Sequence, residues 1–251
     1  MYNNMGVIKN LYWKIGTLIY NQPTLRKYIK PLYRKIVISR ENNSKNDLFR
    51  KNGLKVIKEF DEILTDNSIP YILFFGSLLG AIREKGFIKH DLDIDVAIWN
   101  EDYSKIIKEI LERAGFKLTK NILVEDGRFA REETYEKDGI GIDIFYIYPY
   151  SEKEGYVCCF RNYPNSINFE HSIAKFGGLY SVQYYFPIEK KIKRILFENA
   201  LLLPIPSNAH DIMKCIYGAS YMTPQPKREA GSFREYQNLL FDKVGIYTEF
   251  N

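Results

Sequence analysis

Apolar residues near the N-terminus recur at steps of three and four positions, which is the spacing of one face of an amphipathic helix. The first such group is Val7, Ile8, Leu11, Ile15, Leu18 and Ile19. We therefore predict an N-terminal helical segment over residues 1–40. The polar stretch 41–46 predicts a linker, and a second helix is expected to start at Asp47, a preferred N-cap type, and to run to Thr65.

The rest of the chain changes between strand-like and helix-like patterns, which favours an α/β (α+β) fold. Residues 150–195 are rich in Tyr and Phe, and we expect them to form irregular structure over a site. The predicted elements are strands over 72–75 and 91–96, a helix over 102–114 with Ile106, Ile107, Ile110 and Leu111 inside, a hairpin of 116–124 and 128–135 around Asp126-Gly127, a strand over 139–148 and a helix over 208–216.

The turn after the first apolar strand has the chemistry of a phosphate site. Gly76 permits close backbone approach, Ser77 is a good N-cap, and the residues that follow are strong helix formers. The free N–H groups at the start of such a helix suit an anionic phosphate.

Acidic residues alternate with apolar ones over the strand that comes next. Side chains on a strand change face at every residue, so Asp91, Asp93 and Asp95 share one face. Three carboxylates on one face repel each other, and Mg²⁺ is typically held by one or two carboxylates together with substrate phosphates. The alternative interpretation is the solvated face of an edge strand.

Asp143 is an isolated acid within the apolar strand 139–148. An ionised Asp buried without a partner is costly, and a metal shared with Asp93 and Asp95 would supply one. The alternative is an Asp that meets water at a sheet edge.

Charge is distributed unevenly along the chain. The formal net charge is +5, but residues 1–40 hold eight Lys and Arg and no acid, so residues 41–251 carry −3. A basic amphipathic helix suits an anionic membrane surface, which predicts peripheral contact with the inner face of a membrane through residues 1–40. The alternative is a helix packed on the domain. No apolar run approaches the roughly 20 residues that a bilayer span requires.

The three cysteines, Cys158, Cys159 and Cys215, are odd in number and have no Cys-x-x-Cys spacing. We therefore predict reduced thiols, no zinc site and a cytoplasmic location.

The order of these motifs resembles one protein family. The segments 75–83 (FGSLLGAIR), 86–88 (GFI) and 91–95 (DLDID) are similar to the LicD family, which has the nucleotidyltransferase fold of the DNA polymerase β superfamily. That family includes bacterial phosphocholine transferases and fukutin-type ribitol-phosphate transferases. Residues 197–224 fit its C-terminal pattern, so the resemblance covers residues 50–226. Two departures are Ser77, where Thr is frequent, and Leu92, where the family often has a further acid.

The resemblance implies a mixed sheet flanked by helices, in a catalytic domain that we place at residues 41–251. It implies Mg²⁺ (or Mn²⁺), a CDP-activated alcohol as donor, CMP as leaving group and a glycan acceptor of the capsule, lipopolysaccharide or teichoic acid type, with no nucleic-acid partner. The residues assigned to this chemistry are Asp91, Asp93, Asp95 and Asp143 as catalytic acids, Asp93, Asp95 and Asp143 among them as metal ligands, and Gly76, Ser77, Gly80 and Arg83 at the phosphates.

Several alternatives stay open at this point. Asp91 or Asp143 would accept the proton of the acceptor hydroxyl, and Arg83 would bind a diphosphate oxygen or be an ordinary surface arginine. Other functions compatible with the motifs are a nucleotidyltransferase that releases pyrophosphate, an Asp-x-Asp glycosyltransferase, and a binding subunit without catalytic activity.

Overall fold

The computed structural model describes residues 39–166, 168–224 and 236–250. The predicted N-terminal segment over residues 1–40 lies almost entirely outside these ranges. The chain divides into two compact units, and the account that follows concerns the second, Leu48–Asn251.

Helices and strands alternate along the described chain, and the predicted mixed α/β architecture with a large sheet flanked by helices is confirmed. The helices are α3 (Ser39–Asp66), α4 (Phe75–Arg83), α5 (Lys105–Arg113), α6 (Phe169–Phe176) and α7 (Ala209–Tyr217). The strands are β1 (Ile72–Leu73), β2 (Asp93–Trp99), β3 (Lys117–Val124), β4 (Ala130–Lys137), β5 (Ile140–Pro149), β6 (Glu154–Arg161), β7 (Leu179–Pro187), β8 (Ile192–Phe197), β9 (Leu201–Pro206) and β10 (Gln237–Glu249). None of the helices in this part of the chain is long and apolar enough to span a membrane.

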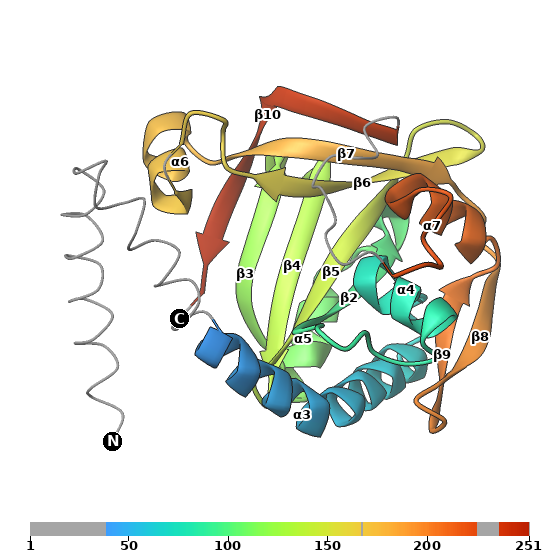
Figure 1. Cartoon of the computed structure of the whole chain (residues 1–251). Coiled ribbons are helices and arrows are strands. Elements are labelled where there is room, and N and C mark those ends of the chain that lie inside the picture. The colour runs from blue at the N-terminus through green and yellow to red at the C-terminus, as the bar shows by residue number, and fades with distance from the viewer. Residues whose placement is uncertain (1–38, 167, 225–235, 251) are drawn as a thin grey trace, which may run out of the picture. The chain divides into compact units, whose positions relative to one another are not determined.

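Eight strands form one sheet in the order β1-β2-β5-β4-β3-β10-β7-β6, and β6 also pairs with the end of β5. The strands from β5 round to β6 therefore form a closed ring, with β6, β7 and β10 arching over the upper ends of β3, β4 and β5 in Figure 1. β2 and β5 are parallel, whereas the other pairs in this sheet are antiparallel. The two-stranded β8–β9 hairpin lies apart, beside α4 and α7 (Figure 1).

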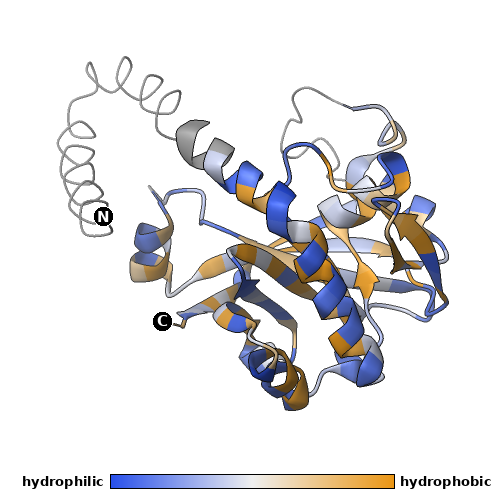
Figure 2. Cartoon of the chain, turned by 90° about the horizontal axis from the view of Figure 1, so that it is seen from below, coloured by the Kyte–Doolittle hydropathy of each residue, from blue (hydrophilic) through white to orange (hydrophobic). Residues whose placement is uncertain are grey.

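Helix α3 is longer than predicted, because it begins at Ser39 and continues through the stretch 41–46. The linker prediction and the Asp47 cap are therefore wrong: the polar residues form the start of the helix, and polar and apolar positions alternate along it (Figure 2). Gly53 sits inside this helix where a Cβ would lie 3.4 Å from the Phe87 ring, so it allows close packing. The buried face is Phe49, Val56, Ile57, Phe60 and Leu64.

The irregular structure predicted over residues 150–195 is also wrong, since the segment contains β6, α6 and β7. Most side chains of β6 and β7 are buried whichever face they point to, so the sequence lacks the apolar–polar alternation of a half-exposed strand. Ile106 was placed on the inner face of α5, but it is 51% exposed. The other three predicted residues of that face are buried. The hairpin of β3 and β4 is confirmed, with Asp126 and Gly127 both at positive φ in its turn. The three cysteines are free, as predicted.

Candidate active site

The junction between β1 and α4 is tighter than the sequence predicts. Helix α4 begins at Phe75, so Ser77 lies in its first turn and does not cap it. Phe75 has φ 35°, a left-handed conformation that is strained for a residue with a bulky side chain. Backbone strain of this kind persists where the surrounding structure holds the residue in place. Here it directs the N–H of Gly76 toward the acidic strand.

Three hydrogen bonds tie this junction to Asp95. The Gly76 N–H donates to Asp95 Oδ2 at 2.9 Å, and the Asp95 N–H donates to Ser77 Oγ at 2.9 Å. The Phe74 N–H donates to the Asp95 carbonyl, also at 2.9 Å. The backbone and carboxylate of Asp95 are thus both fixed by the start of α4.

The two glycines of α4 have different neighbours. A Cβ at Gly76 would lie 3.0 Å from Asp95 Oδ2 and 3.7 Å from Asp91 Oδ1, so the helix start and the acids are in direct contact. A Cβ at Gly80 would lie 2.4 Å from the Gly86 carbonyl oxygen. Gly80, predicted at the phosphates, is therefore packed against the chain that follows α4, and its place in the fold is to let that turn close.

The structure brings three of the four predicted acids onto adjacent strands. β2 and β5 run parallel with Asp95 opposite Asp143 and Asp93 opposite Gly141. Residues paired across neighbouring strands share a face, so Asp93, Asp95 and Asp143 all point to the same side of the sheet. Asp91 lies just before β2, where its Oδ2 accepts a hydrogen bond from the Ile88 N–H at 3.1 Å.

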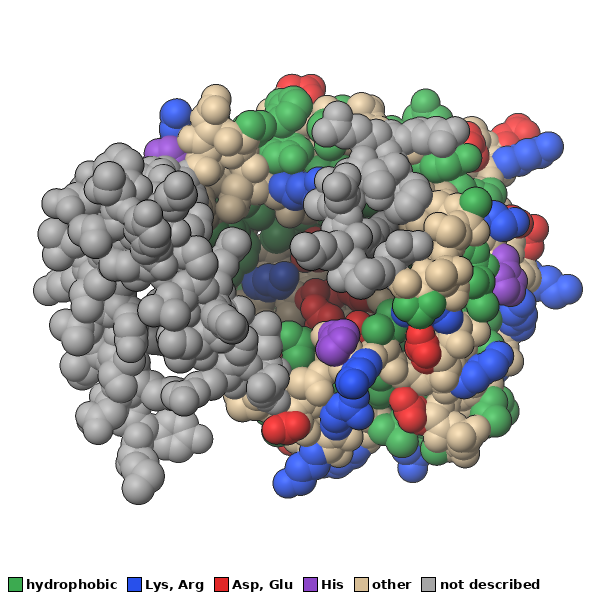
Figure 3. All heavy atoms as spheres, in the orientation of Figure 1, with side chains coloured by type: hydrophobic (Ala, Val, Ile, Leu, Met, Phe, Trp, Pro, Cys, Tyr) green, Lys and Arg blue, Asp and Glu red, His purple; other side chains and the backbone are tan. Residues whose placement is uncertain are grey.

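The same row of paired positions continues into two further strands. Thr134 of β4 pairs with Asp143, and Lys120 of β3 pairs with Thr134. The Thr134 hydroxyl donates to Asp143 Oδ1, while Lys120 Nζ lies 3.9 Å from that oxygen and 3.2 Å from Glu132 Oε1. We call Asp95, Asp143, Thr134 and Lys120 the polar row. Figure 3 shows a hollow in this side of the molecule with acidic and basic side chains at its floor.

Lys120, Thr134 and Glu132 could not be identified from the sequence, because polar residues at alternate positions of a hairpin are typical of a solvated face. Only the strand register shows that they adjoin the acids.

Burial and mutual repulsion disfavour ionisation of these carboxyls. Burial, and then the charges of Asp93 and Asp143, raise the pKa of Asp95 well above its usual value. Burial raises the pKa of Asp91 to about 6 and that of Glu132 to about 7. Burial and the Asp143 charge raise the pKa of Asp93, an effect that Lys120 opposes. A cation among these groups would restore their charged forms.

The chemistry of the donors fits a hard divalent cation such as Mg²⁺ or Mn²⁺, since all are carboxylate oxygens. Within residues 39–166, 168–224 and 236–250, however, no three His, Cys, Asp or Glu side chains already converge on one point. For Asp93, Asp95 and Asp143 to share an ion, side chains must move, and Asp143 would exchange its bond with Thr134 for one to the metal.

Arg83 lies at the last turn of α4, with its side chain largely buried. Its Nε donates to Glu84 at 2.7 Å, and its Nη1 donates to the Tyr221 carbonyl at 3.2 Å. In this structure Arg83 therefore fastens the segment after α7 onto α4, and its predicted contact with a phosphate stays a prediction.

Comparisons with known proteins agree with this arrangement. Residues 68–182 match the family described as LicD/FKTN/FKRP, nucleotidyltransferase domain. The chain is 30% identical to a mouse protein named ribitol-5-phosphate transferase FKTN over 103 residues, which are 40% of this chain and 22% of that protein. It is 33% identical over 76 residues to the lipopolysaccharide cholinephosphotransferase LicD of Haemophilus influenzae, 29% of each chain.

A third relative is similar over most of its length. An uncharacterised protein of Rickettsia prowazekii is 25% identical over 229 residues, 82% of this chain and 80% of that protein. By contrast, the matched region spans less than a third of the mouse and Haemophilus influenzae transferases. The matched region contains β1, α4, β2, β3, β4 and β5, and therefore the whole polar row. The resemblance read from the motifs is thus confirmed: residues 68–182 match the nucleotidyltransferase domain of the LicD/FKTN/FKRP family.

Proposed function

We propose that this protein is a metal-dependent transferase that moves a phosphorylated small alcohol from a CDP-activated donor to a hydroxyl of a glycan, with release of CMP. The observation that carries the proposal is the register of Asp95 and Asp143 on adjacent parallel strands, with the start of α4 bonded to Asp95. The transferred group would be of the phosphocholine, ribitol-phosphate or glycerol-phosphate type, in line with the names of the two transferase relatives.

Asp93, Asp95 and Asp143 would hold the metal. Bound Mg²⁺ (or Mn²⁺) would neutralise charge on the donor diphosphate, which is the main requirement of phosphoryl transfer. The N–H groups in the first turn of α4, at Gly76 and Ser77, lie next to these acids and would orient the diphosphate.

Asp91 is the better-placed acceptor for the proton of the attacking hydroxyl. Asp143 is engaged by Thr134 and Lys120, whereas Asp91 uses one oxygen for the Ile88 N–H and leaves Oδ1 next to Gly76. In the proposed reaction the acceptor oxygen bonds to the phosphorus that carries the alcohol. The bond from that phosphorus to the bridging oxygen breaks, CMP leaves with the electron pair, and the hydroxyl proton passes to Asp91.

The experiment that tests this proposal compares two classes of donor. The full-length protein is incubated with Mg²⁺, a glycan acceptor and either CTP or one of CDP-choline, CDP-ribitol and CDP-glycerol. We expect CMP from at least one CDP-alcohol, together with a phosphorylated glycan. Pyrophosphate from CTP, with no CMP from any CDP-alcohol, would instead assign the protein to the nucleotidyltransferases. In a separate incubation with a sugar nucleotide, transfer of the sugar, with no product from CTP or any CDP-alcohol, would assign it to the glycosyltransferases.

The matched control is the pair Asp95→Asn and Asp66→Asn. Both substitutions remove one negative charge, but Asp66 is exposed at the end of α3. Product that forms equally with both variants would contradict the assignment of Asp95 to the metal site.

The proposal includes peripheral binding to the cytoplasmic face of a membrane through residues 1–40. Its basis is the charge and periodicity of the sequence, because this segment lies outside the described residues. Full-length protein should sediment with anionic vesicles at low salt, and a chain that lacks residues 1–40 should not. Equal sedimentation of the two would remove the membrane role.

A further inference from the structure

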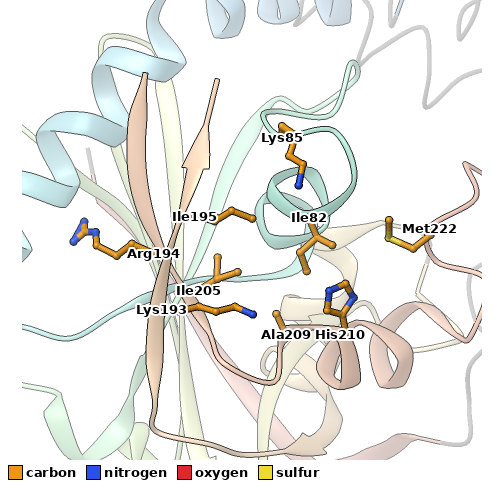
Figure 4. Close-up of a pocket in the computed structure, with 9 residues that line it drawn as sticks. All are labelled: Ile82, Lys85, Lys193, Arg194, Ile195, Ile205, Ala209, His210 and Met222. Atoms are coloured by element: carbon orange, nitrogen blue, oxygen red, sulfur yellow. The ribbon is translucent and has the colours of Figure 1, made fainter. Parts of the chain in front are cut away.

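A second cavity lies at the other end of α4 from Gly76. The last turn of that helix, the β8–β9 hairpin and α7 enclose about 360 Å³. That is within the range of small-molecule sites, roughly 300–1,000 Å³. Figure 4 shows the side chains that surround it.

The floor of this cavity is aliphatic. Ile82 of α4, Ile205 of β9 and Ala209 of α7 are buried, and Ile195 of β8 adds to the same surface. Met222 is 47% exposed at the edge. Such a surface suits the apolar part of a ligand, since its side chains have no hydrogen-bonding groups.

Two lysines stand over this floor. Lys85 follows α4 and Lys193 lies in β8, and Figure 4 shows both ammonium ends directed into the space between the three elements. Lys193 Nζ donates to the Ser207 carbonyl at 3.2 Å. Neither lysine has a carboxylate partner among the residues that the structure describes. Arg194 differs, since its side chain points away from the cavity and pairs with Asp61.

The acids closest in sequence to Lys85 and Lys193 have other partners. Glu84 binds Arg83, and Glu198 accepts a hydrogen bond from the Phe87 N–H at 2.9 Å. Glu189 accepts one from the Ser207 hydroxyl. No carboxylate is among the residues that line the cavity, so the two lysines are the charged groups directed into it.

The backbone at Lys85 is the third observation. Lys85 has φ 62°, a left-handed conformation that favours Gly or Asn, and its carbonyl accepts a hydrogen bond from the Glu198 N–H at 2.7 Å. The turn is thus locked to the β8–β9 hairpin with a lysine in a strained position. Strain of this kind is an indicator of function when the side chain it presents faces a cavity.

From these three observations we infer that the cavity binds a soluble organic phosphate. Lys85 and Lys193 bind the phosphate group, and the aliphatic floor covers the attached carbon chain. His210, whose ring bonds to the Tyr221 hydroxyl, closes the side toward α7. This site is separate from the polar row, and the inference does not depend on the proposed function.

Isothermal titration of the full-length protein in EDTA, with butyl phosphate as the probe, tests the inference. We expect saturable binding to the wild type and at least a tenfold loss of affinity in Lys85→Gln/Lys193→Gln. The matched control is Lys58→Gln/Lys108→Gln, which removes two exposed lysines that pair with Glu62 and Glu112 on helices. Its affinity should equal that of the wild type, as should that of Asp95→Asn.

Four results would overturn the inference. They are no binding of butyl phosphate at millimolar concentration, equal affinity in Lys85→Gln/Lys193→Gln, loss in the control pair, and loss in Asp95→Asn. Inorganic phosphate and butanol, titrated separately, should each bind more weakly than butyl phosphate, because each uses half of the site. If phosphatidic acid vesicles bind through Lys85 and Lys193 while butyl phosphate does not, the ligand is a lipid headgroup and the soluble-ligand inference is wrong.

Discussion

Glu132 and Glu133 are consecutive residues of β4, and both are buried, at 7% and 5% exposed. They point to opposite faces of the sheet and have opposite surroundings. Glu133 lies in a closed network, where its carboxylate accepts hydrogen bonds from the Tyr146 hydroxyl at 3.0 Å, the Tyr135 hydroxyl at 3.4 Å and Arg131 Nη1 at 3.4 Å. Glu132 lies on the same face as Asp143, and its Oε1 accepts a hydrogen bond from Lys120 Nζ at 3.2 Å.

The two acids differ in how far the fold compensates their charge. Around Glu133 each carboxylate oxygen has a donor, and Arg131 also stacks on the Tyr103 ring at 3.7 Å, so the charge of Glu133 is compensated within the fold. Arg131 Nε is a buried donor that has no hydrogen-bond partner among the described residues. On the face of Glu132 the acids outnumber the cations. Burial raises the pKa values of Asp95 and Glu132, because too few cations lie nearby to stabilise the charged carboxylates. An incomplete polar cluster that faces a hollow is typical of a site that awaits a charged ligand.

The largest expected effect concerns the sheet face that carries Asp95, Asp143 and Glu132. Asp95→Asn should lower turnover at least 10³-fold, because Asp95 is a proposed metal ligand and its negative charge is lost. The free energy of unfolding in EDTA should stay the same or rise, since one of several mutually repelling acids is removed. CMP release and urea denaturation measure the two quantities. Near-normal turnover in excess Mg²⁺ would contradict the metal-site assignment.

The next effect concerns the opposite sheet face, which carries Glu133. Glu133→Gln should lower the free energy of unfolding by about 3 kcal/mol, because it leaves the buried Arg131 guanidinium without its counter-charge. Glu132→Gln should cost less than about 1 kcal/mol at pH 7, where the native residue is already partly protonated. Urea denaturation of the two variants compares them directly. Equal losses would show that the two faces do not differ as described.

The pH dependence of stability follows from the raised pKa values. For Glu132 the pKa rises from 4.5 to about 7 on folding, so the folded state binds more protons than the unfolded state within that window. In EDTA the stability of the wild type should therefore fall as the pH rises from about 4.5 to about 7, with at most about 3 kcal/mol due to this group. Glu132→Gln should flatten the curve, whereas the exposed control Glu152→Gln should not. A wild-type curve that rises over the same window would be contrary to the assigned burial.

The smallest effect concerns Lys120. Lys120→Met should lower kcat/KM for the donor about tenfold, since the cation of the polar row helps to attract the diphosphate. Lys108→Met, on the surface of α5, should leave kcat/KM unchanged. An unaltered value for Lys120→Met would limit Lys120 to offsetting the charge of Glu132.

The acidic strand could be predicted because its pattern is local: alternation alone places Asp93 and Asp95 on one face. The isolated acid in an apolar strand indicated that Asp143 would lie near Asp93 and Asp95, but the parallel pairing that brings the strands together was not predicted. The remainder of the site could not be predicted from the sequence, because Lys120 and Thr134 join it through the register of the β3–β4 hairpin.

Two other features depend on long-range packing. The ring of strands closes through β10, which pairs with β3 and β7 far away in sequence. The start of α4 at Phe75 requires a positive φ that no propensity favours. It is held by hydrogen bonds to β2 and by packing of the Phe75 ring on Phe145 and Tyr184. Residues 41–46 read as a linker because helix propensity is a weak prior in a polar stretch.

The three hydrogen bonds that fix Asp95 to the start of α4 bear on the motions of the site. The amide proton of Asp95 can exchange with solvent only when its hydrogen bond to Ser77 Oγ opens. That opening would also separate α4 from β2. Exchange at Asp95 should therefore be among the slowest in the chain, at a rate set by cooperative unfolding and not by local breathing. The backbone of Asp95 should then keep its position, and the movements that admit a ligand would occur in side chains and in other parts of the site.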